Sequence, residues 1–243
     1  MERLLNRQRF KIRLNHPDFY VIEKPAGLNF HSENGEMGFV VQCQQQLKEQ
    51  IDEGIELYPV HRLDKMTSGL VILAKNRMAA QKFQHLFAQK QIEKVYLALS
   101  VQKPKKKQGW IKGDMVPARR GSWKLTRTQQ HPAITYFESQ GLANEKVPGF
   151  ASLRLFYLYP KTGKTHQIRV ALKSIGAPIL GDERYADKVS ASKQDRGYLH
   201  AFALKFAWAG EMVSLYANPQ EGELFQSAPI QQLIREKMDD KSE

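Results

Sequence analysis

The decisive stretch of this chain is HRLDKMTSGLVILAK, residues 61–75. Its second half, from Gly69 to Ala74, is a short continuous apolar run, which is typical of a fully buried strand. Its first half places Arg62 and Asp64 in a turn that leads into this strand. A carboxylate held at the entrance of a rigid strand is well placed for catalysis. The alternative is an ordinary surface Arg–Asp pair, which contributes little to stability.

The segments on either side predict an alternation of strands and helices. We expect further strands at 10–15, 19–24, 95–101, 133–139, 152–159 and 199–208, and helices over about 38–51, 77–90, 165–175 and 229–238. Gly176 follows the third helix where a C-terminal cap is expected. In 199–208 large apolar residues alternate, which predicts a strand with one apolar face. The sequence has no internal repeat and no long linker.

The net charge indicates an anionic partner. The chain has 37 Lys and Arg against 25 Asp and Glu, a formal charge of +12. Nucleic acid is the commonest partner of so basic a protein, and an acidic membrane surface is the next. A basic protein whose charge only aids solubility is the third reading. No apolar run approaches the roughly 20 residues that span a bilayer, so we expect no membrane partner.

The cysteine content argues against disulfides and zinc. Cys43 is the only cysteine, so it can form neither an internal disulfide nor a zinc site, and the histidines lack metal-ligand spacing. The N-terminus has no signal-peptide core. We therefore expect no metal and a reducing, cytoplasmic location.

One basic segment stands apart in composition. Residues 103–127 read KPKKKQGWIKGDMVPARRGSWKLTR, rich in Gly and Pro, with Trp110 and Trp123. Such a segment is either a flexible insertion or a pair of ribbons that grip RNA. The alternative is a solvated loop whose tryptophans pack on the domain.

Six short motifs follow one another along the chain. They are EKPAG (23–27), HRLD with TSG (61–69), KVYLA (94–98), TGKTHQIR (162–169), GD with Tyr185 (181–185) and LHA (199–201). Together they closely resemble the signature of the RluA family of pseudouridine synthases, over about residues 18–218. Any one motif could arise by chance, but this number in the same order is specific.

The resemblance implies a fold and a division of the chain. The implied fold is α+β, with a mostly antiparallel mixed sheet and flanking helices around a central cleft. We expect an N-terminal extension at 1–17, a catalytic domain at 18–218 with a basic insertion at about 103–127, and a C-terminal helix and tail at 219–243. Residues 1–17 are too few for the S4-type RNA-binding module of longer relatives. RNA affinity must then come from the catalytic domain, with the basic segment.

The resemblance also implies roles for single residues. Asp64 matches the essential carboxylate of the family, and Arg169 matches the basic residue that pairs with it. Tyr96 matches the tyrosine that lies against the target base and is implicated in removing its C5 proton. Arg62 matches the arginine that helps to displace that base. Further candidates for RNA contact are His61, Thr67, Lys164, His166 and Gln167.

The implied reaction is the isomerisation of a uridine to pseudouridine in structured RNA, either ribosomal or transfer RNA. It breaks the N1–C1′ bond, turns the uracil and joins C5 to C1′, so it requires no redox cofactor and no metal. Asp64 either attacks C1′ or removes a proton from C2′ to give a glycal. An adjacent guanidinium would keep Asp64 ionised. The target base must leave its stack to be reached.

Two other functions stay open. The chain could be an RNA chaperone that retains the fold without the activity, or an N-glycoside hydrolase that releases free uracil from a nucleoside.

Two positions depart from the family pattern. Ala171 stands where the family commonly has His, and Lys164 stands in place of a frequent Arg. We expect the first departure to change only packing, because position 171 continues the apolar face of its helix.

Overall fold

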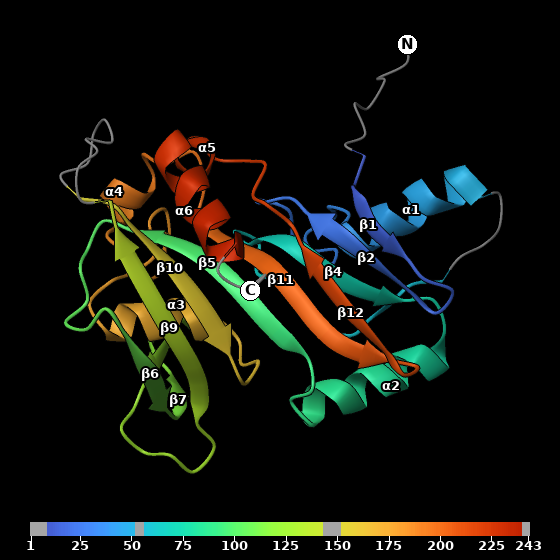
Figure 1. Ribbon diagram of the computed structural model, residues 1–243, viewed down its shortest axis with the longest axis horizontal. Coiled ribbons are helices and arrows are strands. Elements are labelled where there is room, and N and C mark those ends of the chain that lie inside the picture. The colour runs from blue at the N-terminus through green and yellow to red at the C-terminus, as the bar shows by residue number, and fades with distance from the viewer. Residues whose placement is uncertain (1–8, 52–55, 143–151, 240–243) are drawn as a thin grey trace.

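The computed structural model describes residues 9–51, 56–142 and 152–239. A large sheet crosses the molecule (Figure 1), with the strands in the order β1-β2-β4-β11-β5-β10-β9-β6. Their bounds are β1 Ile12–Asn15, β2 Phe19–Lys24, β4 Ser68–Ala74, β11 Leu199–Trp208, β5 Glu93–Ser100, β10 Arg154–Pro160, β9 Ala133–Gly141 and β6 Gln108–Gly113. Off this path, β3 (Tyr58–Pro59) pairs with β4, and β12 (Glu211–Tyr216) pairs with β11.

The helices flank this sheet. They are α1 Phe39–Ile51, α2 Arg77–Ala88, α3 Gln167–Ser174, α4 Lys188–Ala191, α5 Glu223–Gln226 and α6 Ala228–Asp239. Within the described residues every strand pairing is antiparallel except that of β4 with β11. The predicted α+β architecture, a mostly antiparallel mixed sheet with flanking helices, is confirmed.

The β2–β4 part of the sheet has an apolar core on each face. Successive strand residues point to opposite faces, so alternate residues enter different cores. One set packs with α2, namely Phe19, Val21, Leu70 and Ile72. The other set packs with α1, namely Tyr20, Ile22, Val71 and Leu73. Helices α1 and α2 therefore cover opposite faces, which explains why β4 is buried at every position and apolar from Leu70 to Ala74.

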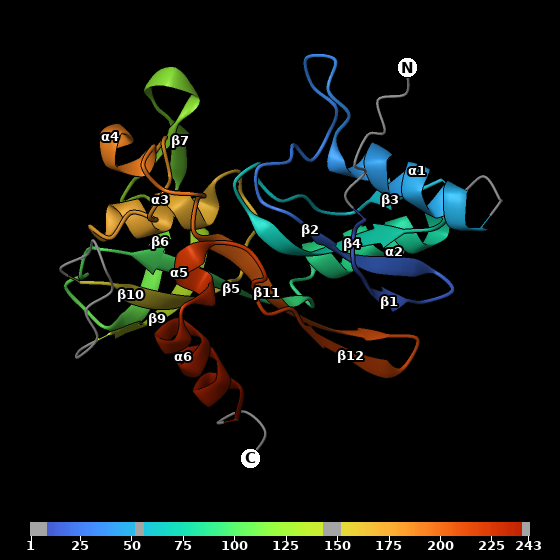
Figure 2. The ribbon, with the colours of Figure 1, turned by 90° about the horizontal axis from the view of Figure 1, so that it is seen from above.

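Strand β11 joins the two halves of the sheet. It lies between β4 and β5, and Figure 2 shows α1 and α2 with β1, β2 and β4 on one side of it, and α3, β9 and β10 on the other. The parallel seam is short, with His200 opposite Ser68 and Ala201 opposite Gly69. A Cβ at Gly69 would lie 2.2 Å from the Ala201 carbonyl oxygen. Only glycine fits this close approach.

The basic segment is ordered as strands. β6 adds to the main sheet beside β9, and β7 (Met115–Pro117) pairs with β8 (Trp123–Leu125) in a hairpin whose tip is a short 3-10 turn, Arg119–Gly121. Trp110 is 53% exposed on β6, while Trp123 is partly buried. The segment therefore contains paired strands, as the ribbon alternative requires, and its grip on RNA stays a prediction.

The predicted elements are present, with small differences at their ends. The predicted helix at 165–175 begins at Gln167, because His166 before it has a left-handed φ of 57°. β1 falls in the expected extension, and α5 and α6 fall in the expected tail, where Phe225, Ile230 and Ile234 join the core. The proposed division at 17 and 218 stays a prediction. Residues 1–8 and 240–243 of those parts lie outside the described residues.

Candidate active site

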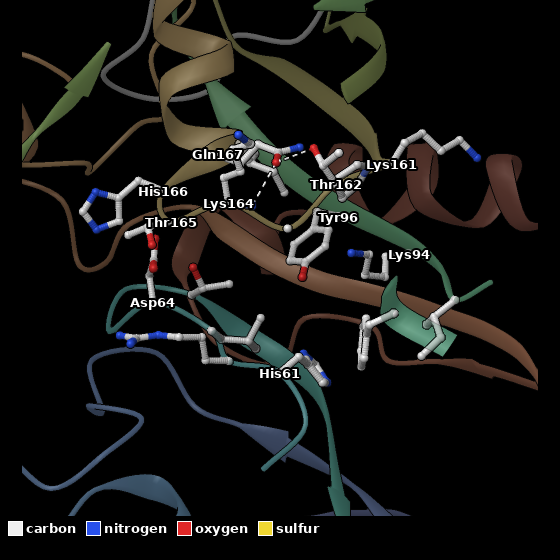
Figure 3. A pocket seen from close by; sticks show the side chains of 18 of the residues that line it. His61, Asp64, Lys94, Tyr96, Lys161, Thr162, Lys164, Thr165, His166 and Gln167 are labelled. Atoms are coloured by element: carbon white, nitrogen blue, oxygen red, sulfur yellow. Dashed lines mark hydrogen bonds between the residues drawn. The ribbon is translucent and has the colours of Figure 1, made fainter. Parts of the chain in front are cut away.

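A cavity of about 590 Å³ opens where the turn before β4, strand β5 and the start of α3 meet (Figure 3). All nine site residues that the sequence predicts line it. They are His61, Arg62, Asp64, Thr67, Tyr96, Lys164, His166, Gln167 and Arg169. The motifs that carry these residues are far apart in the chain, and the fold brings them to one cavity.

The turn that carries Asp64 is held from below by a lysine. The Thr67 N–H donates to the Asp64 carbonyl at 3.0 Å, which closes the turn. Lys24 is buried under it, and its ammonium donates to the carbonyls of Pro25, Lys65 and Thr67 at 2.8, 3.3 and 2.9 Å. This ammonium thereby uses its three donors on backbone oxygens, two of them in the turn. Lys24 fixes the place of the Asp64 backbone.

Arg169 of α3 holds the side chain of Asp64. Its Nη1 donates to Asp64 Oδ2 at 3.1 Å, while its Nε and Nη2 donate to the two oxygens of Asp182 at 2.8 Å each. Burial acts to lower the pKa of Arg169, but the hydrogen bonds and charges of Asp182 and Asp64 outweigh it and raise that pKa. The guanidinium is a permanent cation here. It is anchored by Asp182 independently of Asp64.

One oxygen of Asp64 is left for the substrate. Within the described residues only Oδ2 accepts a hydrogen bond, so Oδ1 has no protein partner there, and Asp64 lines the cavity. Tyr96 lies across from it on β5, as Figure 3 shows. Burial, together with the charge of Asp64, raises the pKa of Tyr96, so its phenol is neutral at physiological pH. A carboxylate and an aromatic face thus border the same space.

The comparisons with known proteins agree on one family. A family model described as RNA pseudouridylate synthase matches residues 18–174. The chain belongs to the RNA pseudouridylate synthase family. An uncharacterized RNA pseudouridine synthase of Haemophilus influenzae is 47% identical over 210 residues, which are 86% of this chain and 88% of that protein. Membership makes this chain an isomerase that converts uridine to pseudouridine in RNA.

Other relatives of this synthase are named for two kinds of RNA. Ribosomal large subunit pseudouridine synthase C of Rickettsia bellii is 34% identical over 184 residues, which are 74% of this chain and 58% of that longer protein. tRNA pseudouridine synthase C of Haemophilus ducreyi is 32% identical over 184 residues, 70% of this chain and 71% of that protein. The structure of human RNA pseudouridylate synthase domain containing 4 has the same fold, with a TM-score of 0.72 at 24% identity over 90% of this chain and 92% of that one.

His166 links the active site of the synthase to the β7–β8 hairpin. Its left-handed backbone is uncommon for a residue other than glycine and turns the ring toward Tyr185, whose hydroxyl lies 2.9 Å from its Nδ1. The same hydroxyl accepts from the Trp123 N–H at 2.9 Å. Burial lowers the pKa of His166, which favours the neutral ring. A chain of hydrogen bonds thereby ties the start of α3 to β8.

Two predicted RNA-contacting residues are occupied within the protein. Nε2 of His61 accepts from the Ile72 N–H at 2.9 Å, and burial, with the charge of Lys94, lowers the pKa of His61 to about 3. The Gln167 amide is buried, and its four bonds go to Thr162, to the Lys164 N–H, to the Ile134 carbonyl and to Thr135. Both side chains brace the walls of the cavity. Their contact with RNA stays a prediction.

The remaining candidates differ in their access to a ligand. Arg62 is exposed at the rim of the cavity, and Lys164 is partly buried with its ammonium bonded to the His131 carbonyl. Thr67 is buried at the floor. Contact between these three residues and RNA is likewise untested by the fold.

A second, larger hollow adjoins the first at Arg169. It encloses about 950 Å³ between the tip of the β7–β8 hairpin and residues 181–197. Its lining includes the basic residues Lys65, Arg119, Arg120, Arg184 and Lys188 and the acidic residues Glu183, Asp195 and Glu221. Arg184 donates to the Arg120 carbonyl at 2.7 Å, which ties the hairpin to the opposite wall. We call this hollow the basic groove.

The described ranges contain neither a metal-binding cluster nor a membrane-spanning helix. No group of three or more His, Cys, Asp or Glu in these ranges could hold a metal ion. The same ranges contain no helix of the length and apolarity that crossing a membrane requires.

Proposed function

We propose that this synthase isomerises a uridine of ribosomal or transfer RNA with Asp64 as the carboxylate that acts on the sugar, Arg169 as its positioning cation and Tyr96 as the surface for the flipped base. The observation that carries the proposal is that Asp64, whose Oδ1 accepts no hydrogen bond among the described residues, lines the same cavity as Tyr96. The names of the relatives support both kinds of RNA.

Asp64 must be ionised for either route of the reaction. The guanidinium of Arg169 donates to Oδ2 of this carboxylate, which leaves Oδ1 available to the substrate. That oxygen either bonds to C1′ as the N1–C1′ bond breaks or takes the proton from C2′. C1′ and C2′ are adjacent atoms of the ribose, and the proposal covers both routes.

Tyr96 presents an aromatic face to the cavity. A base that has left its stack loses contact with its neighbours, and an aromatic side chain restores part of that contact. The phenol is neutral, so it accepts the C5 proton only as it gives up its own hydroxyl proton. We propose that Asp64, whose charge acts on Tyr96, is the carboxylate that receives this hydroxyl proton.

The RNA strand needs a path to the cavity. We propose that its phosphates lie in the basic groove. This hollow meets the cavity at Arg169. Among the described residues, no ion pair with a carboxylate engages its cations Lys65, Arg119, Arg120 and Lys188. Neutralising phosphates with Lys and Arg is the main source of affinity for RNA. We further propose that the protein works in the cytoplasm, where these RNAs are.

The test is the release of tritium from RNA labelled at C5 of uridine. RNA from cells that lack this protein is incubated with the wild type, with Asp64→Ala and with Glu211→Gln, which replaces an exposed carboxylate on β12. We expect release by the wild type and by Glu211→Gln, and at least 1,000-fold less by Asp64→Ala with RNA binding retained.

Other outcomes would favour the two competing functions. If no RNA pool releases tritium but RNA refolding is accelerated by wild type and Asp64→Ala alike, the chain is a chaperone with this fold. If free uracil accumulates instead of pseudouridine, it is a hydrolase. Either result contradicts the proposed isomerisation.

A further inference from the structure

Lys94 is a partly buried cation that the proposed mechanism does not use. It stands two residues before Tyr96 on β5, so both side chains point to the same face, and both line the cavity. No carboxylate pairs with it and no hydrogen bond engages it within the described residues; its nearest recorded contact is the Phe87 ring, 5.6 Å from Nζ. Burial lowers the pKa of Lys94 to about 8.

An unpaired, buried lysine is uncommon because its desolvation costs free energy. By contrast, Lys24 is fully buried and bonds to three carbonyls. Lys94 keeps its donors free at the wall of the active site. Such a group is available to a ligand.

Lys94 lies at the end of the cavity that is remote from Asp64. The charge of Asp64 acts on Tyr96, whereas the charge of Lys94 acts on His61 at the other end. Figure 3 shows the same order, with Tyr96 between Asp64 and Lys94. A nucleotide whose sugar is at Asp64 and whose base lies on Tyr96 therefore extends the far edge of its base toward Lys94.

The uracil ring has a particular property in this position. The ring atom opposite N1 is C4, which carries O4, and the ring atom opposite C5 is C2, which carries O2. While N1 is bonded to the sugar, O4 is the atom farthest from C1′. After the ring has turned and C5 is bonded to the sugar, O2 is the farthest. A fixed cation at the far end thus meets a carbonyl oxygen both before and after the reaction.

We propose that Lys94 binds the far carbonyl oxygen of the flipped uracil, O4 in the substrate and O2 in the product. This inference rests on the proposed function of the site. When the N1–C1′ bond breaks, its electron pair stays on the uracil, which becomes an anion while C1′ is taken over by Asp64 or by the glycal. The ammonium of Lys94 stabilises that charge on the ring oxygens. C5 then bonds to C1′ as the bond between Asp64 and C1′ breaks, or as the glycal takes its C2′ proton back from Asp64. C5 loses its proton to Tyr96 as the phenol passes its own to Asp64, Asp64 returns that proton to solvent and N1 takes one from solvent, so Lys94 ends the cycle as it began.

The same contact selects uracil over cytosine. Cytosine has an amino group at C4, and an ammonium has donors only, so the two donors would face each other without an acceptor. Leaving a buried polar group unpaired in this way discriminates strongly.

The first experiment separates binding from structure. Lys94→Met replaces the side chain by an apolar one of similar length, and Lys205→Met removes an exposed lysine of the neighbouring strand β11 as the matched control. We expect Lys94→Met to lower kcat about 100-fold, as the loss of one donor to a developing anion does, with KM for RNA within threefold. Lys205→Met should keep the wild-type kcat.

The melting temperature distinguishes this role from a structural one. Replacing an unpaired, partly desolvated ammonium by an apolar group removes its desolvation free energy from the folded state. Lys94→Met should therefore melt at the wild-type temperature or above it. A fall in both melting temperature and activity would overturn the proposal. So would full activity of Lys94→Met, and that result would leave the pseudouridine synthase function intact, since the wild type is active in the same assay.

A second experiment locates the contact on the base. RNA with 4-thiouridine at the target has a weaker acceptor at position 4. The wild type should lose about tenfold in rate on it, while Lys94→Met should lose no more than twofold, because the contact is already gone. Equal losses in both proteins would place Lys94 away from position 4 and overturn the assignment.

Discussion

Arg169 bonds to two carboxylates that differ in their surroundings. Asp182 is fully buried and receives two hydrogen bonds from the guanidinium, whereas Asp64 is partly exposed and receives one. The buried partner anchors the cation, and the exposed one is presented to substrate. The two residues should therefore respond differently to the loss of their charge.

Asp182→Asn should destabilise the protein by about 3–5 kcal/mol, because it leaves a buried guanidinium with one weak partner. Asp64→Asn should cost about 1 kcal/mol or less. Urea unfolding measures both, with the exposed neighbour Glu183→Gln as the control. Equal destabilisation by the two Asp variants would contradict the anchoring role.

The sequence predicted the residues that meet the cavity better than the residues that hold them. Asp64, Tyr96 and Arg169 stand in the quoted motifs, and the fold brings them to one cavity. Asp182 was seen in its motif without a role, because a partner 13 residues beyond Arg169 has no helical or strand spacing. Lys24 was missed as a support, because its acceptors at Lys65 and Thr67 are 41 and 43 residues away.

The β7–β8 hairpin is the element on which RNA affinity should depend. Its tip carries Arg119 and Arg120 at the basic groove, and Tyr185 and Arg184 tie it to the body. Lys105 and Lys106 belong to the same basic segment but line neither hollow. The composition of the segment did not reveal this difference, because only the pairing of β6 with β9 separates the two parts.

Replacing both arginines by Gln should weaken RNA binding and reduce the slope of log affinity against log salt concentration by about 1.4–1.8, since each phosphate contact contributes about 0.7–0.9. Binding is measured between low and physiological salt. Lys105→Gln with Lys106→Gln has the same loss of charge and should keep the wild-type slope. A double arginine variant with the wild-type slope would show that the phosphates lie elsewhere.

The whole molecule is divided by the seam of β4 and β11, and neutral histidines lie beside it. His200 Nε2 donates to the Ala217 carbonyl at 2.7 Å, which leaves Nδ1 to accept from Ser68 at 2.7 Å across the seam. His61 accepts from Ile72 on β4. Burial lowers the pKa of each ring to about 3. Neither ring can be protonated without losing its bond to β4.

Stability should therefore fall in mild acid. In the unfolded chain these two histidines bind protons near pH 6.5, while in the folded protein they do so only near pH 3, so stability is full above pH 6.5 and decreases as the pH falls toward 3. From pH 6 to pH 5 the two rings should remove about 2 kcal/mol. Urea unfolding at both values tests this, with His131→Gln, an exposed histidine, as a control that keeps the same dependence. Constant stability over this range would contradict two neutral rings.

The sequence predicted individual strands and helices, but not which strands that are far apart in the chain pair with each other. The apolar run of β4 and the alternation of β11 indicated buried strands, and both are there. That the two strands approach each other closely depends on Gly69, whose missing side chain admits the backbone of Ala201. A glycine in a motif does not show which strand approaches it.

The place of β11 in the chain also has a consequence for protein synthesis. The ribosome releases the chain from its N-terminus, and folding follows in that order. Asp64, Tyr96 and Arg169 are all made before Leu199–Trp208, the strand that joins their two halves of the sheet. A nascent chain that already contains every side chain proposed for catalysis therefore has no assembled cavity. We therefore expect this RNA-modifying enzyme to be inactive while it is being synthesised on the ribosome, until the last quarter of the chain has emerged.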